Sequence, residues 1–258
     1  MGFSRKAPSA AKRKNTLVVA DFMHMQEVVL KWNELAGNLD YKNLPRSAKG
    51  STVLTNLEKT YHQLSHEEFF GKDELKQGIE TNDLVMIADG LCDSVFTVFM
   101  WAVLSGEGLD HQDSMFLQDI EDEKDNYFDQ PLAIDVDWYK AAIEKGDAFE
   151  AQTQLIILLQ RFNKKIDIME AFNKVCDSNF SKFPRRDSVM DVGAECRKIE
   201  EKGRYRGISA KLIDNDSRIV FLAREEVVGD NVKVYGVPKI VKSSQFRDVQ
   251  NLAETIRK

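Results

Sequence analysis

Two carboxylates interrupt an otherwise apolar stretch of this sequence. Their residue type and their spacing make them the first candidates for a functional site. Asp89 and Asp93 lie within residues 83–106, which are otherwise almost wholly apolar. The pattern predicts a helix, and four-residue spacing places both side chains on one face, one turn apart. An ionised carboxylate in apolar surroundings is strongly unfavourable unless it is paired or bound to a cation. The pair therefore predicts a partner.

Acidic residues upstream could complete such a site. Glu67, Glu68 and Glu74 lie on or near the preceding predicted element, so two acidic groups on separate helices could face each other inside a bundle. Oxygen ligands suit a hard cation such as Mg²⁺, whose coordination is usually completed by substrate phosphates; Mn²⁺ is an alternative. The chemistry that follows is metal-assisted attack of water on a phosphoryl group. A structural alternative stays open, in which Asp89 favours the helix start and Asp93 pairs with a Lys or Arg.

Helices must position these residues. Apolar residues recur at helical spacing over 17–36, over 51–64, and from 149 to a helix end near Lys182. Ser65 with Glu68 has the form of a capping box, which predicts a new helix there, although Gly71 would weaken it. Beyond Pro184 the apolar pattern changes to period two. The predicted fold class is mainly α, a four-helix-bundle-like all-α core with a small C-terminal β-hairpin or sheet.

The predicted organisation has three parts. Residues 1–16 form a basic arm, residues 17–184 the helical core, and residues 185–258 a small β-rich appendage. Within the core, residues from about 106 to 150 are acidic and read as a loop-rich insertion. The acidic run 119–129 lacks the central Gly and the ligand alternation of a calcium loop, so a solvated acidic loop is the favoured interpretation.

Composition narrows the class of protein. Of 258 residues, 43% are hydrophobic and 30% charged, and the formal net charge of −6 argues against a surface built for nucleic acid. Cys92, Cys176 and Cys196 lack CxxC spacing, so neither a disulfide framework nor a zinc site is expected, and a reducing cytoplasm is predicted. The apolar run after Asp93 reads as too short to span a bilayer, and Asp89 and Asp93 are expected to prevent the longer window from qualifying as a membrane helix, so no membrane partner is expected.

Three ordered segments carry a resemblance to a known family. Residues 73–106, DELKQGIETNDLVMIADGLCDSVFTVFMWAVLSG, resemble the MazG-like all-α nucleoside triphosphate pyrophosphohydrolases, in which an acidic pair precedes a helix of the form iaDglaDllYvv. Residues 167–183, DIMEAFNKVCDSNFSKF, resemble the segment that closes that core. Residues 203–223 and 239–246 are similar to the strand-rich ending of phage-type members. The resemblance covers about half of the chain.

The resemblance implies Mg²⁺-dependent hydrolysis of a nucleoside triphosphate between its α- and β-phosphates, giving a monophosphate and pyrophosphate. Glu74, Asp89 and Asp93 match acidic positions of the family. A gapless match puts Phe70 and Gly71 where the family has a glutamate pair, so a small insertion is needed to bring in Glu67 and Glu68. The resemblance implies that the catalytic residues are Glu67, Glu68, Glu74, Asp89 and Asp93. It implies that the metal ligands are Glu67, Glu74, Asp89 and Asp93.

Substrate contacts are expected from two other helices. Asn179 and Lys182 match the N.SK segment of the family, where a Lys can neutralise phosphate charge. On the first helix His24 is a candidate for base contact, as are Phe22, Gln26 and Trp32, although an aromatic stripe at helical spacing is more often core. A homodimer or higher oligomer is expected from the family and from the long apolar helix. The expected location is the cytoplasm, which is that of the host cell if the gene belongs to a phage.

Two other functions stay open. One is a non-catalytic helical binding protein derived from the same fold, which engages a protein or nucleic-acid partner. The other is a helical phosphohydrolase with a related carboxylate cage and a different substrate. The products of nucleotide hydrolysis distinguish all three.

Overall fold

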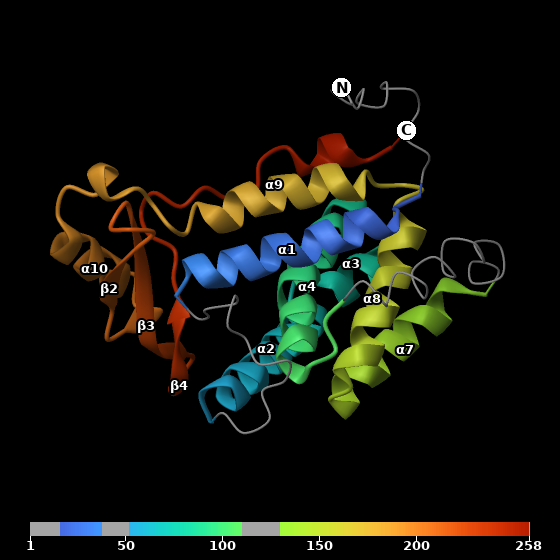
Figure 1. The fold of residues 1–258 in the computed structure, drawn as a ribbon, viewed down its shortest axis with the longest axis horizontal. Coiled ribbons are helices and arrows are strands. Elements are labelled where there is room, and N and C mark those ends of the chain that lie inside the picture. Colours follow the sequence, from blue (N-terminus) through green and yellow to red (C-terminus); the bar gives the residue numbers. More distant parts are fainter. Residues whose placement is uncertain (1–15, 38–51, 110–129, 258) are drawn as a thin grey trace, which may run out of the picture.

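The computed structural model describes residues 16–37, 52–109 and 130–257. The helical part comprises α1 (Val19–Leu35), α2 (Thr52–Phe70), α3 (Leu75–Thr81), α4 (Leu84–Ser105), α7 (Leu132–Lys145), α8 (Ala148–Phe162) and α9 (Ile168–Phe180). It is followed by α10 (Val192–Glu201) and by the strands β1 (Tyr205–Arg206), β2 (Ser209–Ile213), β3 (Arg218–Val228) and β4 (Asn231–Ile240). The sheet and α10 lie at one end of the molecule, and α7 and α8 lie at the other (Figure 1).

Helix α4 is the centre of the helical part. It begins after Asp83, whose carboxylate accepts hydrogen bonds from the amides of Val85 and Met86, and it ends at Gly106, whose φ of 85° suits glycine. The predicted helix over 83–106 is therefore confirmed. α1, α2, α3, α8 and α9 all pack against α4 and cover its apolar side chains. Its apolar surface is covered within one chain, so a second subunit is not needed to explain it.

Helix α4 also bears on the membrane expectation. Its 22 residues are long and apolar enough to cross a bilayer by length and composition, contrary to the expectation that Asp89 and Asp93 would prevent this longer window from qualifying. However, 72% of the most apolar window is buried inside the protein. A core helix of a soluble protein has the same properties, so α4 does not decide where the protein resides.

The carboxylates upstream of α4 lie around a helix break. The capping box predicted at Ser65 is wrong: α2 continues through Ser65, whose buried hydroxyl donates to the Tyr61 carbonyl at 2.9 Å. α2 ends at Phe70, the chain turns through residues 71–74, and α3 begins at Leu75. Asp73 has a φ of 64° in this turn. The break lets Glu68, in the last turn of α2, and Glu74, directly before α3, face the same side.

The segment predicted to be a loop-rich insertion contains a helix. α7 occupies its second half, and Tyr139, Ala142 and Ile143 are buried there at helical spacing. The many charged residues of this segment obscured that short apolar face. Residues 110–129, which include the acidic run, and the basic arm up to residue 15 lie outside the described residues.

The C-terminal region corrects the predicted fold class. Residues 205–240 form a four-stranded antiparallel sheet, in which β3 is central and pairs with β4 on one side and with β1 and β2 on the other. Its longest strands have 11 and 10 residues. The sheet and α10 share a second hydrophobic cluster of Ile199, Ile219, Phe221, Ala223 and Val241. The predicted four-helix-bundle-like all-α core with a small hairpin or sheet is therefore wrong: the chain combines a helical part with a substantial four-stranded sheet.

The sheet is attached to the helical part by apolar contacts, since Ile213 and Val220 belong to the same hydrophobic core as the helices, and by polar and backbone contacts. Arg218 Nη1 donates to the Phe183 carbonyl at 2.8 Å, and the Ile219 amide donates to the Pro184 carbonyl at 3.0 Å. β4 also contacts α2. These contacts bring one face of the sheet to the carboxylates of the helical part.

Candidate functional site

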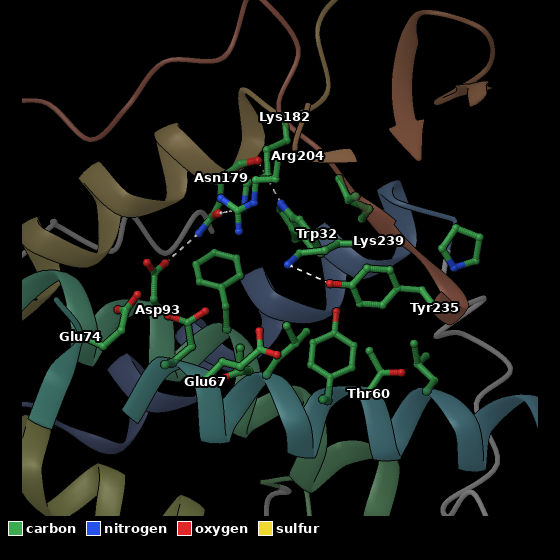
Figure 2. A pocket seen from close by; sticks show the side chains of 18 residues that line it. Trp32, Thr60, Glu67, Glu74, Asp93, Asn179, Lys182, Arg204, Tyr235 and Lys239 are labelled. Atoms are coloured by element: carbon green, nitrogen blue, oxygen red, sulfur yellow. Dashed lines mark hydrogen bonds between the residues drawn. The ribbon is translucent and has the colours of Figure 1, made fainter. Parts of the chain in front are cut away.

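A pocket of about 300 Å³ lies where α2, α4 and α9 meet the sheet (Figure 2). Its helical wall contains the carboxylates of Glu67, Glu68, Glu74 and Asp93. Its other walls contain the basic side chains of Lys182, Arg204 and Lys239. Apolar and aromatic groups fill the space between them, chiefly Trp32, Leu57, Tyr61, Leu64, Phe96 and Tyr235. The pocket thus places an acidic wall across from a basic one.

The carboxylates of the acidic wall affect each other's ionisation. Burial, together with the charges of Asp93 and Glu74, raises the pKa of Glu68 well above its usual value. Burial and the charges of Asp93 and Asp89 raise the pKa of Glu74 to about 7. Burial also raises the pKa of Asp93, against the influence of Lys182 and of a hydrogen bond from Asn179. These groups repel each other when ionised, and a bound cation would relieve that repulsion.

Asp89 lines a second pocket of about 230 Å³. This pocket is also lined by Asp93, Asn179, Lys182, Lys242 and Asp248, so the two pockets share Asp93, Asn179 and Lys182. Burial and the charge of Asp93 raise the pKa of Asp89 to about 6. Asp89 Oδ1 is buried and has no hydrogen-bond partner among the described residues. A buried, unpartnered carboxylate oxygen is a chemically suitable cation ligand.

Asn179 and Lys182 join the acidic wall to the aromatic part of the pocket. Asn179 Nδ2 donates to Asp93 Oδ1 at 3.4 Å, and Lys182 Nζ donates to Asn179 Oδ1 at 2.6 Å. The indole of Trp32 donates to the Asn179 carbonyl at 3.1 Å, and Lys182 Nζ lies 5.7 Å from the centre of the Trp32 ring. Burial lowers the pKa of Lys182, although Asp93 acts in the opposite direction.

The structure divides the predicted site residues into two groups. Glu67, Glu68, Glu74, Asp93, Asn179 and Lys182 line the larger pocket, and Asp89 joins them through the smaller one. Glu67 is exposed and its Oε1 pairs with Lys233 Nζ of β4 at 2.8 Å. His24 is exposed on α1 and does not line either pocket, whereas Trp32 on the same helix does.

The sequence predictions did not include the basic residues of the sheet. Arg204 precedes β1, and Tyr235 and Lys239 lie on β4. All three line the larger pocket, and their shared partner is the buried Glu226 of β3. Lys239 and Lys242 fall in the C-terminal segment that carries part of the family resemblance, and this was the available signal.

The described carboxylates have the chemistry of ligands for a divalent cation, but they do not lie close enough together to form a metal site. Among the described residues, no group of three or more His, Cys, Asp or Glu side chains is close enough together to hold a metal ion. The donors are all oxygens, burial and then mutual repulsion raise the pKa values of several of them, and one oxygen is buried without a partner. That donor set suits Mg²⁺ or Mn²⁺ better than Zn²⁺.

Comparisons of the whole chain with protein-family models, with curated proteins and with solved structures find no match. The resemblance to the MazG-like pyrophosphohydrolases therefore stays a prediction.

Proposed function

We propose that this protein is a Mg²⁺-dependent nucleoside triphosphate pyrophosphohydrolase, cleaving its substrate between the α- and β-phosphates to a monophosphate and pyrophosphate. The observation that carries the proposal is the pocket in which Glu68, Glu74 and Asp93 face Lys182, Arg204 and Lys239 (Figure 2). A polyphosphate with bound cations needs both kinds of group, because anionic ligands hold the cation while basic side chains hold phosphate oxygens.

Glu74, Asp89 and Asp93 would hold the cation, and Glu67, the fourth ligand that the family resemblance implies, lies at the edge of the cluster in an ion pair with Lys233. A Mg²⁺ held there would offset negative charge on the polyphosphate and polarise its phosphoryl oxygens. Mn²⁺ offers the same coordination chemistry and is the alternative cofactor.

The protein's own groups supply positioning and proton transfer. Glu68 has a raised pKa and lies in the pocket, so it is the candidate base that takes the proton from an attacking water. Lys182 is held by Asn179 and is the candidate donor to a phosphate oxygen. Trp32 and Phe96, whose rings lie 6.1 Å apart in an edge-to-face arrangement, form the apolar part of the pocket where a nucleobase could bind.

The test is an incubation of the purified protein with each ribo- and deoxynucleoside triphosphate and Mg²⁺, followed by separation of the products. Monophosphate and pyrophosphate are expected. Asp93→Asn should abolish turnover because it removes a carboxylate from the centre of the cluster. Asp177→Asn is the matched control: Asp177 is exposed on α9 and lines neither pocket. Diphosphate and phosphate as products would instead indicate a different phosphohydrolase.

A non-catalytic binding protein is the second candidate. Glu67 is engaged by Lys233, and the described carboxylates are not gathered as a ready metal site. This function predicts no turnover with any divalent cation, together with retained nucleotide binding or capture of a macromolecular partner. Homodimer formation is part of the first proposal, and sedimentation equilibrium of the purified protein tests it.

A further inference from the structure

The C-terminal sheet and the residue directly before its first strand contribute a pair of basic side chains, Lys239 and Arg204, to the pocket. Arg204 and Lys239 both approach Glu226, whose side chain is only 7% exposed. Arg204 Nε donates to Glu226 Oε1 at 2.7 Å, and Lys239 Nζ donates to Glu226 Oε2 at 3.1 Å. The hydroxyl group of Tyr235 donates a hydrogen bond to the same carboxylate. These bonds hold the pKa of Glu226 at about 2, so it is ionised at neutral pH.

The charges of this network do not cancel. Two cations share one buried carboxylate, which leaves one net positive charge on the face of the sheet that lines the pocket. Glu226 takes only the Nε donor of Arg204, and the two Nη groups carry the other four donors of the guanidinium. The Arg204 side chain is 63% exposed, so an incoming anion can reach it.

The position of each cation is fixed by its neighbours. Lys239 Nζ lies 5.5 Å from the ring centre of Tyr235 and 5.9 Å from that of Tyr205. The Arg204 guanidinium lies 5.1 Å from the ring centre of Tyr205. Such contacts restrict long side chains before a ligand arrives and reduce the entropy lost on binding. The pair is therefore built to present positive charge in a defined place.

The sheet is held over the acidic wall by a contact of its own. Lys233, on the same strand as Lys239, pairs with Glu67 of α2 at 2.8 Å. Figure 2 shows Arg204 and Lys239 across the pocket from Glu67, Glu74 and Asp93, with Lys182 on their side. A ligand that spans the pocket would meet carboxylates at one wall and three cations at the others.

We propose that Arg204 and Lys239 form a binding subsite for the polyphosphate chain of the substrate, supplied by the C-terminal sheet. This subsite rests on the proposed pyrophosphohydrolase function in its choice of ligand. It assigns the sheet a direct role in binding, beyond that of an appendage to a helical enzyme. Guanidinium and ammonium groups bind phosphate oxygens by charge-assisted hydrogen bonds. The acidic wall alone would repel the negatively charged phosphate.

The test uses inorganic triphosphate as the probe, titrated calorimetrically into the full-length protein in Mg²⁺ buffer at constant ionic strength. Each of Arg204→Gln and Lys239→Gln should weaken binding about tenfold, the usual effect of losing one charge-assisted hydrogen bond. Lys239→Arg keeps the charge and should keep most of the affinity. Arg206→Gln is the matched control, since Arg206 is exposed on β1 and does not line the pocket.

Thermal melting of each variant separates loss of binding from loss of folding, because a variant that melts like the wild type still has its sheet. Unchanged triphosphate affinity in both folded variants overturns the subsite, as does a wild-type protein that does not bind triphosphate. Steady-state kinetics give an independent readout: KM for the nucleotide should rise more than kcat falls. Triphosphate binding that depends on both cations, without any nucleotide hydrolysis, would sink the proposed enzyme function and leave the subsite standing.

Discussion

The ammonium group of Lys182 donates a hydrogen bond to the side-chain oxygen of Asn179 at 2.6 Å. Asn179 lies in the last turn of α9, and Lys182 lies just beyond the end of this helix. The amide nitrogen of Asn179 in turn donates to Asp93 at 3.4 Å. Asn179 therefore links a cation to a carboxylate and orients both. Burial lowers the pKa of Lys182, so its charged form is less well solvated here than in water and gains more from a phosphate partner.

Replacing Lys182 with Gln should raise KM for the nucleotide about tenfold or more, because the phosphate loses a charge-assisted hydrogen bond. Steady-state hydrolysis measures the change. Lys174→Gln serves as the control: Lys174 is also on α9, and its charge is paired with Glu170 and Glu254 outside both pockets. Equal KM values for wild type and Lys182→Gln would remove Lys182 from the phosphate site.

Close packing of α3 on α4 positions Glu74 beside Asp89 and Asp93. A Cβ atom added at Gly90 would lie 2.8 Å from the backbone Cα of Leu75, the residue after Glu74. Gly90→Ala should therefore push α3 away from α4, with a loss of about 1–3 kcal/mol in the free energy of unfolding, typical of overpacking. Activity should fall as well, because the carboxylates separate.

Urea unfolding of Gly90→Ala measures this effect. The comparison variant is Gly193→Ala in α10, where an added Cβ would meet its nearest atom at 3.4 Å, an ordinary contact. Alanine favours a helix over glycine by about 1 kcal/mol, so this variant should match or exceed the wild type in stability. A Gly90→Ala protein as stable and active as the wild type would contradict the packing argument.

The sequence was most informative where one strong local pattern decided the structure. The bounds of α1 and α4 follow from helical spacing and, for α4, from Asp83 and Gly106 at its ends. α10 was missed because its buried face is short, with Ile199 as its one fully apolar buried residue. The sheet was underestimated because period-two segments reveal strands but not how many of them pair.

The candidate site divides in the same way. Asp89 and Asp93 could be found because charge inside an apolar helix is locally anomalous. Arg204 and Lys239 could not be found from local chemistry, since a basic residue in a polar segment has no such anomaly, and only the family resemblance of the segments that contain them gave a signal. Their proximity to Asp93 is a tertiary contact between segments more than 100 residues apart in the chain.

The raised pKa values predict how stability depends on pH. Native Glu74 has a pKa of about 7 against 4.5 in an unfolded chain, and native Asp89 about 6 against 3.8. The native state binds these protons more tightly, so this contribution to stability is fully present below about pH 4 and is lost as the pH rises through 6 and 7. The loss should be on the order of 1–2 kcal/mol, because solvent screens half-buried groups.

Urea unfolding in EDTA at pH 5 and pH 8 measures that loss, and Glu74→Gln should flatten the profile. Mg²⁺ should stabilise the protein clearly at pH 8, where the carboxylates are ionised, and little at pH 5, where protons compete with the cation. Equal stabilisation by Mg²⁺ at both pH values would argue against binding at these carboxylates.

The two glutamates brought in by the assumed insertion should not be equivalent. Glu67 is exposed and forms an ion pair with Lys233. Glu68 is half-buried, and burial together with the charges of Asp93 and Glu74 raises its pKa well above the usual value. Glu68→Gln keeps the shape of the side chain but removes its capacity to accept a proton. It should lower kcat by about two orders of magnitude or more, the usual contribution of a general base.

Glu67→Gln should lower kcat/KM only a few-fold, because an exposed ion pair contributes about 0–1 kcal/mol. Lys233→Gln is its matched partner, since it breaks the same contact from the sheet side and should have an effect of similar size. If Glu67→Gln is as damaging as Glu68→Gln while Lys233→Gln is harmless, Glu67 must leave Lys233 to act on the substrate or the cation. In that case the ion pair across the pocket would have to open during each catalytic cycle.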